Sequence, residues 1–336
     1  MSLKSKKVVV TGAGGFIGSH LVEELLPIAG SVKAFTINHE LSPHGWLDYL
    51  PKETLESIEL VSGDIRDPHG VISIMKDADV VFHLAALISI PFSYSYPELF
   101  LETNVRGTLN VLQAARQCGV EKIVHTSTSE VYGTAQFVPI TESHPLNPQS
   151  PYAASKISAD HMALAMSKSY ALPVVIVRPF NTFGPRQSTR AIIPTIITQI
   201  LRGERSIRLG SIHTTRDFTY VKDTVKGFVA AACSEKAIGE VVHLSSNFEI
   251  SIQELVETIA TQMGVSVNIE QSMERLRPQN SEVERLWGSN EKARNLLHWQ
   301  PQHVGSAGFR SGLKEAIDWF SDNNNLACYN TGTYLV

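Results

Sequence analysis

The sequence has few cysteines and no long apolar run. Its 336 residues include only three cysteines, Cys118, Cys233 and Cys328, which are far apart. This number and spacing exclude a disulfide framework and the paired cysteines of a zinc site. No run of about 20 apolar residues occurs, and the apolar run before Gly12 is too short for a signal-peptide core. We therefore expect a cytoplasmic protein with no membrane partner.

Excess charge is also small, because 29 Lys+Arg stand against 33 Asp+Glu and leave a net charge of −4. Such a balance gives no general attraction for nucleic acid or an anionic membrane, so neither is expected as a partner. The histidines are scattered, and His39 and His44 lack further ligand-type neighbours at metal spacing, so no metal site is expected. Hydrophobic residues make up 43% of the chain, enough for a sizeable core.

The first half alternates short β-branched runs with helical patterns, which is typical of a parallel sheet covered by helices. Strands are predicted at 8–11, 31–37, 58–61, 80–84, 122–126 and 174–177, and helices at 69–77, 97–117 and 152–170. Beyond this point, strands at 207–209, 217–220, 241–245 and 267–270 mix with helices near 191–202, 221–234, 251–263 and 308–321. We predict an α/β fold with a Rossmann-type doubly wound parallel sheet over residues 1–178. A smaller, interleaved α+β lobe follows over 179–322, and a tail over 323–336.

Glycines at positions 12, 15 and 18 lie between the first predicted strand and a helix that starts near Phe16 and Ile17. Gly12 permits a tight turn, Gly15 lets backbone N–H groups approach a pyrophosphate, and Gly18 allows close helix–strand packing. A glycine-rich turn without a ligand is the alternative, and the strand–turn–helix context disfavours it. The GxxGxxG spacing resembles the cofactor site of the extended short-chain dehydrogenases/reductases, which implies a dinucleotide.

The type of dinucleotide is indicated by the stretch that reads the adenosine ribose. Residues 35–38, Phe-Thr-Ile-Asn, contain no acid, but they also offer no arginine to compensate a 2′-phosphate, so NAD is favoured over NADP. The resemblance further implies that Asp64 and Ile65 flank the adenine; the alternative for Asp64 is an ordinary strand-end aspartate. It also implies that Leu84, Ala85 and Ala86 form a turn beneath the phosphates.

Tyr152 and Lys156 stand four residues apart and share one helix face, where the ammonium stabilises a phenolate that acts as a base. A Tyr-x-x-x-Lys match alone is weak, but this one opens a helix after the fifth strand, as the resemblance requires. Thr128, Ser129 and Glu130 follow that strand. The segment resembles the corresponding one of sugar-nucleotide epimerases, which commonly ends in small residues without a carboxylate. The resemblance implies a sugar substrate, and a carboxylate here can remove the acidic C5 proton of a 4-keto sugar and assist loss of the C6 hydroxyl. The alternative is a solvated strand-end glutamate.

Thr128-Ser129-Glu130 resembles the triplet of GDP-mannose 4,6-dehydratases, but UDP-glucuronate decarboxylases carry it as well. Segments 44–48, 87–94 and 277–283 are similar to the N-acetylglucosamine-nucleotide 4,6-dehydratases of legionaminic acid biosynthesis. The resemblance implies substrate contacts at Asn181, Arg216 and Arg277, with the arginines on phosphate, and a homodimer built on the helices at 97–117 and 152–170. Ser89 is assigned to the sugar pocket or, equally, to loop packing.

These patterns together predict an NAD-dependent sugar-nucleotide 4,6-dehydratase, a lyase acting on UDP- or GDP-N-acetylglucosamine. A UDP-glucuronate decarboxylase or an NDP-hexose C4-epimerase remains open as the alternative. A dinucleotide-binding protein without catalytic activity is a remote third candidate, which the Tyr152/Lys156 pair disfavours.

Overall fold

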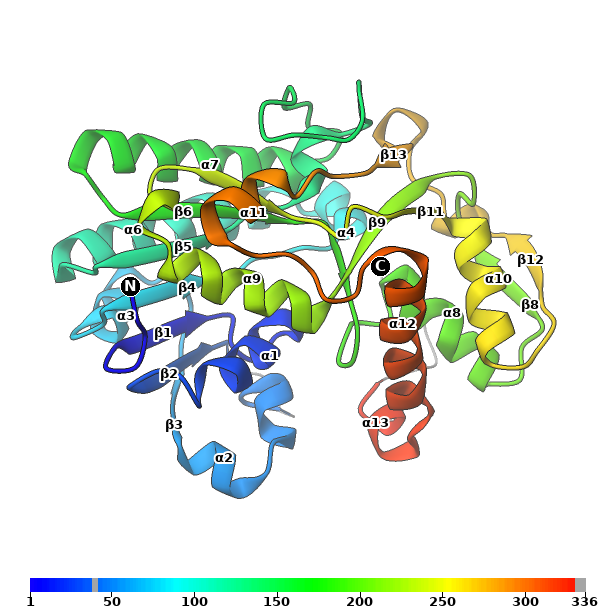
Figure 1. Ribbon diagram of the computed structural model, residues 1–336, viewed down its shortest axis with the longest axis horizontal. Coiled ribbons are helices and arrows are strands. Elements are labelled where there is room, and N and C mark those ends of the chain that lie inside the picture. Colours follow the sequence, from blue (N-terminus) through cyan, green and yellow to red (C-terminus); the bar gives the residue numbers. More distant parts are fainter. Residues whose placement is uncertain (38–41, 330–336) are drawn as a thin grey trace.

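The structure, a computed structural model, describes residues 1–37 and 42–329. Its centre is a seven-stranded sheet with the order β10-β6-β5-β4-β1-β2-β3 and all neighbours parallel (Figure 1). The bounds are β1 Lys7–Thr11, β2 Ser31–Thr36, β3 Ile58–Ser62, β4 Val80–His83, β5 Lys122–Thr126, β6 Val174–Pro179 and β10 Val241–Leu244. This order is that of a dinucleotide-binding sheet, so the predicted Rossmann-type fold is confirmed.

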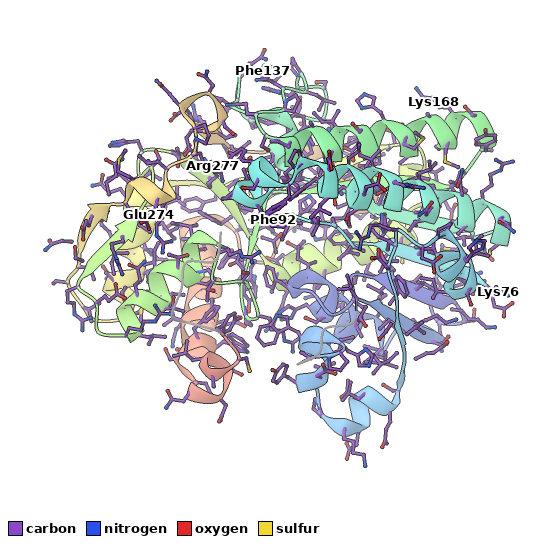
Figure 2. The ribbon with its side chains drawn as sticks, turned by 180° about the vertical axis from the view of Figure 1, so that it is seen from behind. Lys76, Phe92, Phe137, Lys168, Glu274 and Arg277 are labelled. Atoms are coloured by element: carbon purple, nitrogen blue, oxygen red, sulfur yellow. The ribbon has the colours of Figure 1, made fainter. Side chains whose placement is uncertain are left out.

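Helices cover both faces of this sheet, because successive side chains of each strand point to opposite sides. Val8 and Val10 belong to the core beneath α1 and α9, whereas Val9 belongs to the core beneath α3, α6 and α7. The bounds are α1 Phe16–Leu25, α3 Pro68–Met75, α6 Gly107–Cys118, α7 Pro151–Tyr170 and α9 Val221–Cys233. Figure 2, seen from behind, shows α6 and α7 lying along the sheet.

The strand predicted at 241–245 does not belong to the smaller lobe. As β10 it pairs with β6 and forms the outer strand of the main sheet, with Val241 opposite Ile176. Its short apolar run has the same pattern whether it joins one sheet or another, so the sequence alone could not assign it. The main sheet therefore takes one strand from beyond residue 178.

The helix predicted over 97–117 is interrupted. It is built from α5 (Pro97–Phe100), a π-helical segment η2 (Leu101–Arg106) and α6. Within η2 the fully buried Asn104 accepts a hydrogen bond from the Leu87 amide at 2.8 Å and donates to the Leu87 carbonyl at 2.9 Å. Such bulges redirect a side chain that a regular helix would place elsewhere. Here the bulge fastens the helix to the loop after β4.

The smaller lobe lies at one end of the main sheet, to the right in Figure 1. It contains a sheet in which β9 pairs with β7, β11 and β13, and a separate β12–β8 pair. The strands are β7 Asn181–Phe183, β8 Ser206–Leu209, β9 Thr215–Tyr220, β11 Glu249–Ser251, β12 Asn268–Gln271 and β13 Arg285–Leu286. Its helices are α8 Ile192–Leu201, α10 Ile252–Gln262, α12 Gly305–Ser321 and α13 Asn323–Ala327, whereas α11 Glu291–Leu297 packs against α9 and β10 of the main sheet.

The first residues of the tail predicted over 323–336 form a short helix, α13. Beyond it, the Tyr329 ring contacts Trp46 and Phe320 at centroid distances of 5.3 Å each. The rest of the predicted tail, residues 330–336, lies outside the described residues. The remaining short helices are η1 Gly45–Tyr49, α2 Lys52–Glu56, α4 Ile90–Ser95, η3 Ser129–Tyr132, η4 Glu235–Ala237, η5 Met273–Arg275 and η6 Gln279–Ser281. No helix within 1–37 and 42–329 is long and apolar enough to cross a membrane.

Candidate active site

The turn between β1 and α1 leaves no room for side chains. Gly12 has a φ of +70°, and a Cβ at this position would stand 2.7 Å from the Ala85 amide nitrogen. A Cβ on Gly18 would overlap the Gly12 carbonyl, so α1 starts in direct contact with the turn. Its N-terminus carries no acidic residue and no side-chain cap at Gly15. A close backbone approach and uncapped N–H groups fit the pyrophosphate of a dinucleotide.

The loop after β4 is fixed against this turn by His83. The His83 Nδ1 lies 2.8 Å from Thr11 Oγ1, and its Nε2 lies 3.0 Å from Thr108 Oγ1. The Ala85 amide also donates to Thr11 Oγ1, at 3.3 Å. Burial lowers the pKa of His83 well below its usual value, so the ring is neutral. Leu84, Ala85 and Ala86 therefore follow a rigid strand end next to Gly12.

The stretch assigned to the ribose is only partly described. Phe35 and Thr36 are buried at the end of β2, whereas Asn38 lies outside the described residues. After this gap the chain returns to the glycine turn, where the Trp46 amide donates to the Gly14 carbonyl at 2.9 Å. The choice of NAD over NADP at this stretch therefore still depends on the sequence argument.

Asp64 and Ile65, assigned to the adenine, follow β3. The Arg66 Nε donates to the Asp64 carboxylate at 2.9 and 3.0 Å, and this hydrogen bonding lowers the pKa of Asp64. Ile65 packs against α6, where a Cβ on Gly107 would stand 2.6 Å from Ile65 Cδ1. The carboxylate is thus paired with its neighbour, and the contact with adenine stays a prediction.

Tyr152 and Lys156 lie in the first turns of α7, whose start is set by Pro151 and by Ser150. The Ser150 hydroxyl accepts a hydrogen bond from the Ala153 amide at 3.1 Å. Both residues are buried and face the end of β5, where the Lys156 ammonium donates to the Thr126 carbonyl at 2.7 Å. The structure brings this predicted pair to the same strand end as the Thr128–Glu130 triplet.

The charge states of the pair follow from burial. Burial raises the pKa of Tyr152 well above its usual value, Glu130 and Asp160 raise it further, and a hydrogen bond from the side chain of Thr128 opposes the rise. Burial also lowers the pKa of Lys156 to about 8, against a favourable interaction with Asp160. At neutral pH the chain alone therefore holds a neutral phenol near a mostly charged ammonium. An additional positive charge next to the Tyr152 hydroxyl would lower its pKa, so that the phenolate could act as a base.

Glu130 is held at the start of η3, since its amide donates to the Thr128 hydroxyl at 3.2 Å. Only 12% of the Glu130 side chain is exposed, which disfavours the reading of a solvated strand-end residue. Ser129, next to it, is buried. The Arg277 Nη1 lies 3.8 Å from Glu130 Oε2, so a cation from the smaller lobe reaches this carboxylate.

The two predicted phosphate arginines meet at one carboxylate. Glu282 Oε1 lies 3.7 Å from Arg216 Nη2 and 3.9 Å from Arg277 Nη1. The Arg277 Nη1 and the Asn181 Oδ1 are buried and have no hydrogen-bond partner in the part of the chain that the structure describes. Buried polar atoms without partners are those that a polar ligand satisfies. The structure thus gathers Arg216 and Arg277 with Glu130, while Asn181 presents an open acceptor.

Ser89 caps α4, because its hydroxyl accepts a hydrogen bond from the Phe92 amide at 3.4 Å. This contact is the loop-packing role that the sequence left open, and the sugar contact stays a prediction. Asn104 was missed by sequence reasoning. Besides Leu87 it bonds Ser155, at 2.9 Å from its Nδ2, which ties η2 to α7 just below Tyr152. An asparagine inside a helical pattern was its only signal, and Asn110 in the same predicted helix gives the same one.

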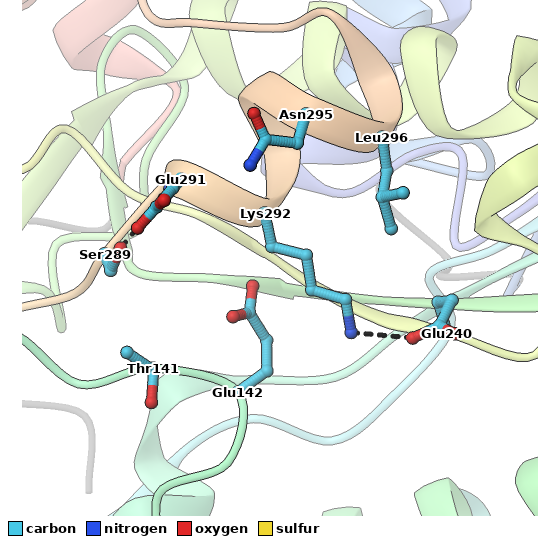
Figure 3. A pocket seen from close by; sticks show the side chains of 8 residues that line it. All are labelled: Thr141, Glu142, Glu240, Ser289, Glu291, Lys292, Asn295 and Leu296. Carbon is cyan, nitrogen blue, oxygen red and sulfur yellow. Dashed lines mark hydrogen bonds and ion pairs between the residues drawn. The ribbon is translucent and has the colours of Figure 1, made fainter.

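Two surface cavities have walls formed by residues other than the catalytic pair. One, of about 590 Å³, is lined by Gln149, Pro278 and Asn280 among others, close in sequence to Arg277. The other, of about 420 Å³, lies between α11 and the loop that carries Glu142. There the Lys292 ammonium binds the Glu240 carboxylate at 2.7 Å (Figure 3). Neither is lined by Tyr152 or Lys156.

Comparison with known proteins places the chain among enzymes that act on nucleotide sugars. The family described as GDP-mannose 4,6 dehydratase matches residues 9–314. The chain is 33% identical over 320 residues to dTDP-glucose 4,6-dehydratase of Streptomyces antibioticus, covering 94% of this chain and 92% of the relative. It is also 33% identical over 324 residues to UDP-glucose 4-epimerase of Mycolicibacterium smegmatis, covering 95% of this chain and 99% of the relative.

Solved structures give the same result. The dTDP-glucose 4,6-dehydratase of Streptomyces venezuelae, solved with NAD, superposes with a TM-score of 0.83 at 30% identity over 95% of this chain and 98% of that one. The UDP-N-acetylglucosamine 4-epimerase of Methanobrevibacter ruminantium superposes with a TM-score of 0.84 at 31% identity over 94% and 98%. The chain belongs to the sugar-nucleotide dehydratase/epimerase family of extended short-chain dehydrogenases/reductases.

Proposed function

We propose that this protein is an NAD-dependent 4,6-dehydratase of a nucleotide-activated N-acetylglucosamine. The observation that carries the proposal is the position of Glu130. Its side chain is shielded from solvent, it lies next to Thr128, and its charge raises the pKa of Tyr152. Neither proton transfer at O4 nor hydride transfer at C4 needs such a carboxylate. Removal of a proton from C5 does.

The glycine turn, the N-terminus of α1 and the loop 84–86 would hold the dinucleotide. NAD⁺, when bound, supplies the acceptor and later the donor of a hydride. The chain's own residues move the protons. Tyr152, assisted by the Lys156 ammonium, takes the proton of the 4-hydroxyl, which Thr128 orients. Once C4 is a ketone, Glu130 takes the acidic C5 proton, and the C6 hydroxyl leaves as water with help from Ser129 or Glu130.

The substrate's diphosphate is assigned to Arg216 and Arg277, and the sugar to Asn181 and Ser89. Arginine suits this role because its fork binds phosphate oxygens in pairs. The overall reaction loses one water and gives a 4-keto-6-deoxy sugar nucleotide with the C5 configuration retained. The N-acetyl group, the UDP or GDP carrier and a place in legionaminic acid biosynthesis come from the sequence resemblance, as does a homodimer. The cytoplasmic location comes from the lack of a signal-peptide core and of a long apolar run in the sequence.

A UDP-glucuronate decarboxylase is the second candidate, and one observation favours it. A decarboxylase needs a cation for the C6 carboxylate, and Arg277 stands 3.8 Å from Glu130, the residue proposed to act at C5 and C6. A 4-epimerase has no comparable need for Glu130, although epimerases occur among the relatives and the solved structures.

Mass spectrometry of the products separates the three reactions. The purified protein with NAD is incubated in turn with UDP-N-acetylglucosamine, GDP-N-acetylglucosamine, dTDP-glucose and UDP-glucuronate. We expect loss of one water from an N-acetylglucosamine nucleotide. Loss of CO₂ from UDP-glucuronate would identify a decarboxylase, and conversion at unchanged mass would identify an epimerase.

The base is tested by Glu130→Gln, for which we expect turnover to fall by about 10²- to 10⁴-fold while NAD binding is kept. The exposed Glu274→Gln is the control, with unchanged turnover. Full turnover of the preferred sugar nucleotide by Glu130→Gln would remove Glu130 from the mechanism.

A further inference from the structure

A second buried carboxylate follows the catalytic pair along α7. Asp160 comes four residues after Lys156 and eight after Tyr152, a spacing that keeps all three on one side of the helix. Its side chain is fully buried, at 0% exposure. Buried aspartates are rare unless paired, so the partners of this group decide what it does.

The Asp160 carboxylate joins α7 to the ends of two strands. Oδ1 lies 3.1 Å from His125 Nε2. Oδ2 accepts hydrogen bonds from Ser127 Oγ at 2.6 Å and from Arg178 Nε and Nη2 at 3.1 and 2.8 Å. Arg178 is held in turn, since its Nη1 donates to the Tyr132 hydroxyl at 2.7 Å. Both oxygens of this carboxylate are therefore held by hydrogen bonds.

Lys156 and Asp160 together hold the last two residues of β5 and the residue that follows it. Asp160 binds residues 125 and 127, and the Lys156 ammonium binds the Thr126 carbonyl that lies between. Thr128 follows directly, with the hydroxyl that reaches Tyr152. The position of the reacting groups is thus tied to a carboxylate that cannot itself touch the substrate.

Asp160 is the anion whose charge acts on the Lys156 ammonium. Burial keeps the pKa values of His83 and His125 below their usual range, so both rings are neutral. The titratable and charged groups that face the Lys156–Asp160 pair are His83 on β4, His125 on β5, Arg178 on β6, Glu130 and Tyr132 on η3, and Tyr152 on α7. The Arg178 guanidinium pairs with the Asp160 carboxylate directly, at 2.8 Å, whereas Lys156 interacts with it over a longer distance, through charge alone.

We propose that Asp160 is a positioning residue that keeps Lys156 charged and holds the Thr126–Thr128 strand end in place for proton transfer by Tyr152. This inference rests on the proposed function for its catalytic meaning, but the charge of Lys156 can be measured without turnover. Loss of the Asp160 charge makes the buried ammonium less stable, so Lys156 deprotonates at a lower pH. A neutral amine supports the Tyr152 phenolate poorly, and activity then falls at a lower alkaline pH.

Asp160→Asn tests this with little change of shape. The amide oxygen can accept hydrogen bonds from Ser127 and Arg178, and the amide nitrogen can donate to His125 Nε2. The His125 ring can carry its proton on Nδ1 instead, because Nδ1 has no partner among the described residues. Lys156 is followed by the pH titration of its ¹³Cε signal in the unliganded protein, assigned by its loss in Lys156→Met. We expect the titration, near pH 8 in the natural chain, to fall by about one unit in Asp160→Asn. The alkaline limb of the pH–rate profile should fall with it.

Two further variants separate charge from structure. Ser127→Ala removes a hydrogen bond to the same carboxylate but no charge, so it should lower turnover while leaving the Lys156 titration in place. Arg178→Gln removes the cation that pairs with Asp160, so the Lys156 titration should move to higher pH. This variant takes the place of Asp160→Asn in the test if Asp160→Asn does not fold.

An unchanged Lys156 titration in either folded charge variant would overturn the proposal. If the protein turned over no nucleotide sugar, the proposed function would fail, while the Lys156 titration would still decide the role of Asp160.

Discussion

The Arg277 guanidinium lies 3.8 Å from the Glu130 carboxylate, so a cation from the smaller lobe meets an acid from the main sheet. Glu282 draws the same guanidinium and that of Arg216 together. This ion pair therefore connects the two halves of the chain at the candidate site. It also links the group expected to bind substrate phosphate with the group expected to act as base.

Arg277→Met should lower kcat/KM for the sugar nucleotide by about 30-fold. The change removes charge-assisted hydrogen bonds worth about 2 kcal/mol, which corresponds to that factor. Arg285→Met is the matched control, because Arg285 is largely exposed and pairs with Glu249 at 2.7 Å, away from Glu130. Exposed pairs contribute about 0–1 kcal/mol, so the control should stay near the natural chain. Equal losses in the two variants would argue against a substrate role for Arg277.

Gly12→Ala should destabilise the fold by about 1–3 kcal/mol and abolish the rise in Tm on adding NAD, because a side chain there is strained at φ +70° and collides with Ala85. Gly15→Ala has an ordinary φ of −75° and a Cβ no closer than 3.2 Å to the Gly12 carbonyl. It should fold nearly normally and show a reduced NAD effect. Thermal unfolding with and without NAD checks both, and an intact NAD effect in Gly12→Ala would contradict the assignment.

The main sheet could be predicted because its strands are buried on both faces and read as continuous apolar runs. The glycine turn and the Tyr152/Lys156 spacing are local, so they too were visible in sequence. The strand at 241–245 was predicted within the smaller, interleaved lobe and without a partner strand, because pairing with β6 is a long-range choice that its residues do not encode locally.

The sequence allowed individual residues of the candidate site to be predicted, but it did not show which of them contact each other. Nothing near Arg277 in sequence indicates that it reaches Glu130, and nothing near Asp160 indicates that it binds β5 and β6. The π-helical segment around Asn104 was also not predicted, because nothing in the local sequence marks the position at which an extra residue enters the helix.

Tyr329→Ala should lower the free energy of unfolding by about 2 kcal/mol. The Tyr329 ring joins Trp46 and Trp319, which lie 5.6 Å apart, and Trp46 in turn touches the glycine turn through Gly14. Tyr170→Ala is the control, since that ring is 53% exposed. Urea unfolding measures both, and equal stability of the two variants would show that the Tyr329 contact does not stabilise the fold.

Stability should fall in acid partly through Asp160. Hydrogen bonds and the Arg178 charge outweigh burial and lower the pKa of Asp160 from 3.8 to about 2. Because the folded-state pKa is depressed, the stabilisation is full above pH 3.8 and is lost as the pH falls toward 2. It amounts to about 2 kcal/mol in total and about half of that between pH 5 and pH 3. Asp160→Asn lacks this contribution, so its urea midpoint should change less over that interval than the midpoints of the natural chain and of Ser127→Ala. If all three midpoints fell in parallel, acid sensitivity would have to arise from other carboxylates, and the depressed pKa of Asp160 would be wrong.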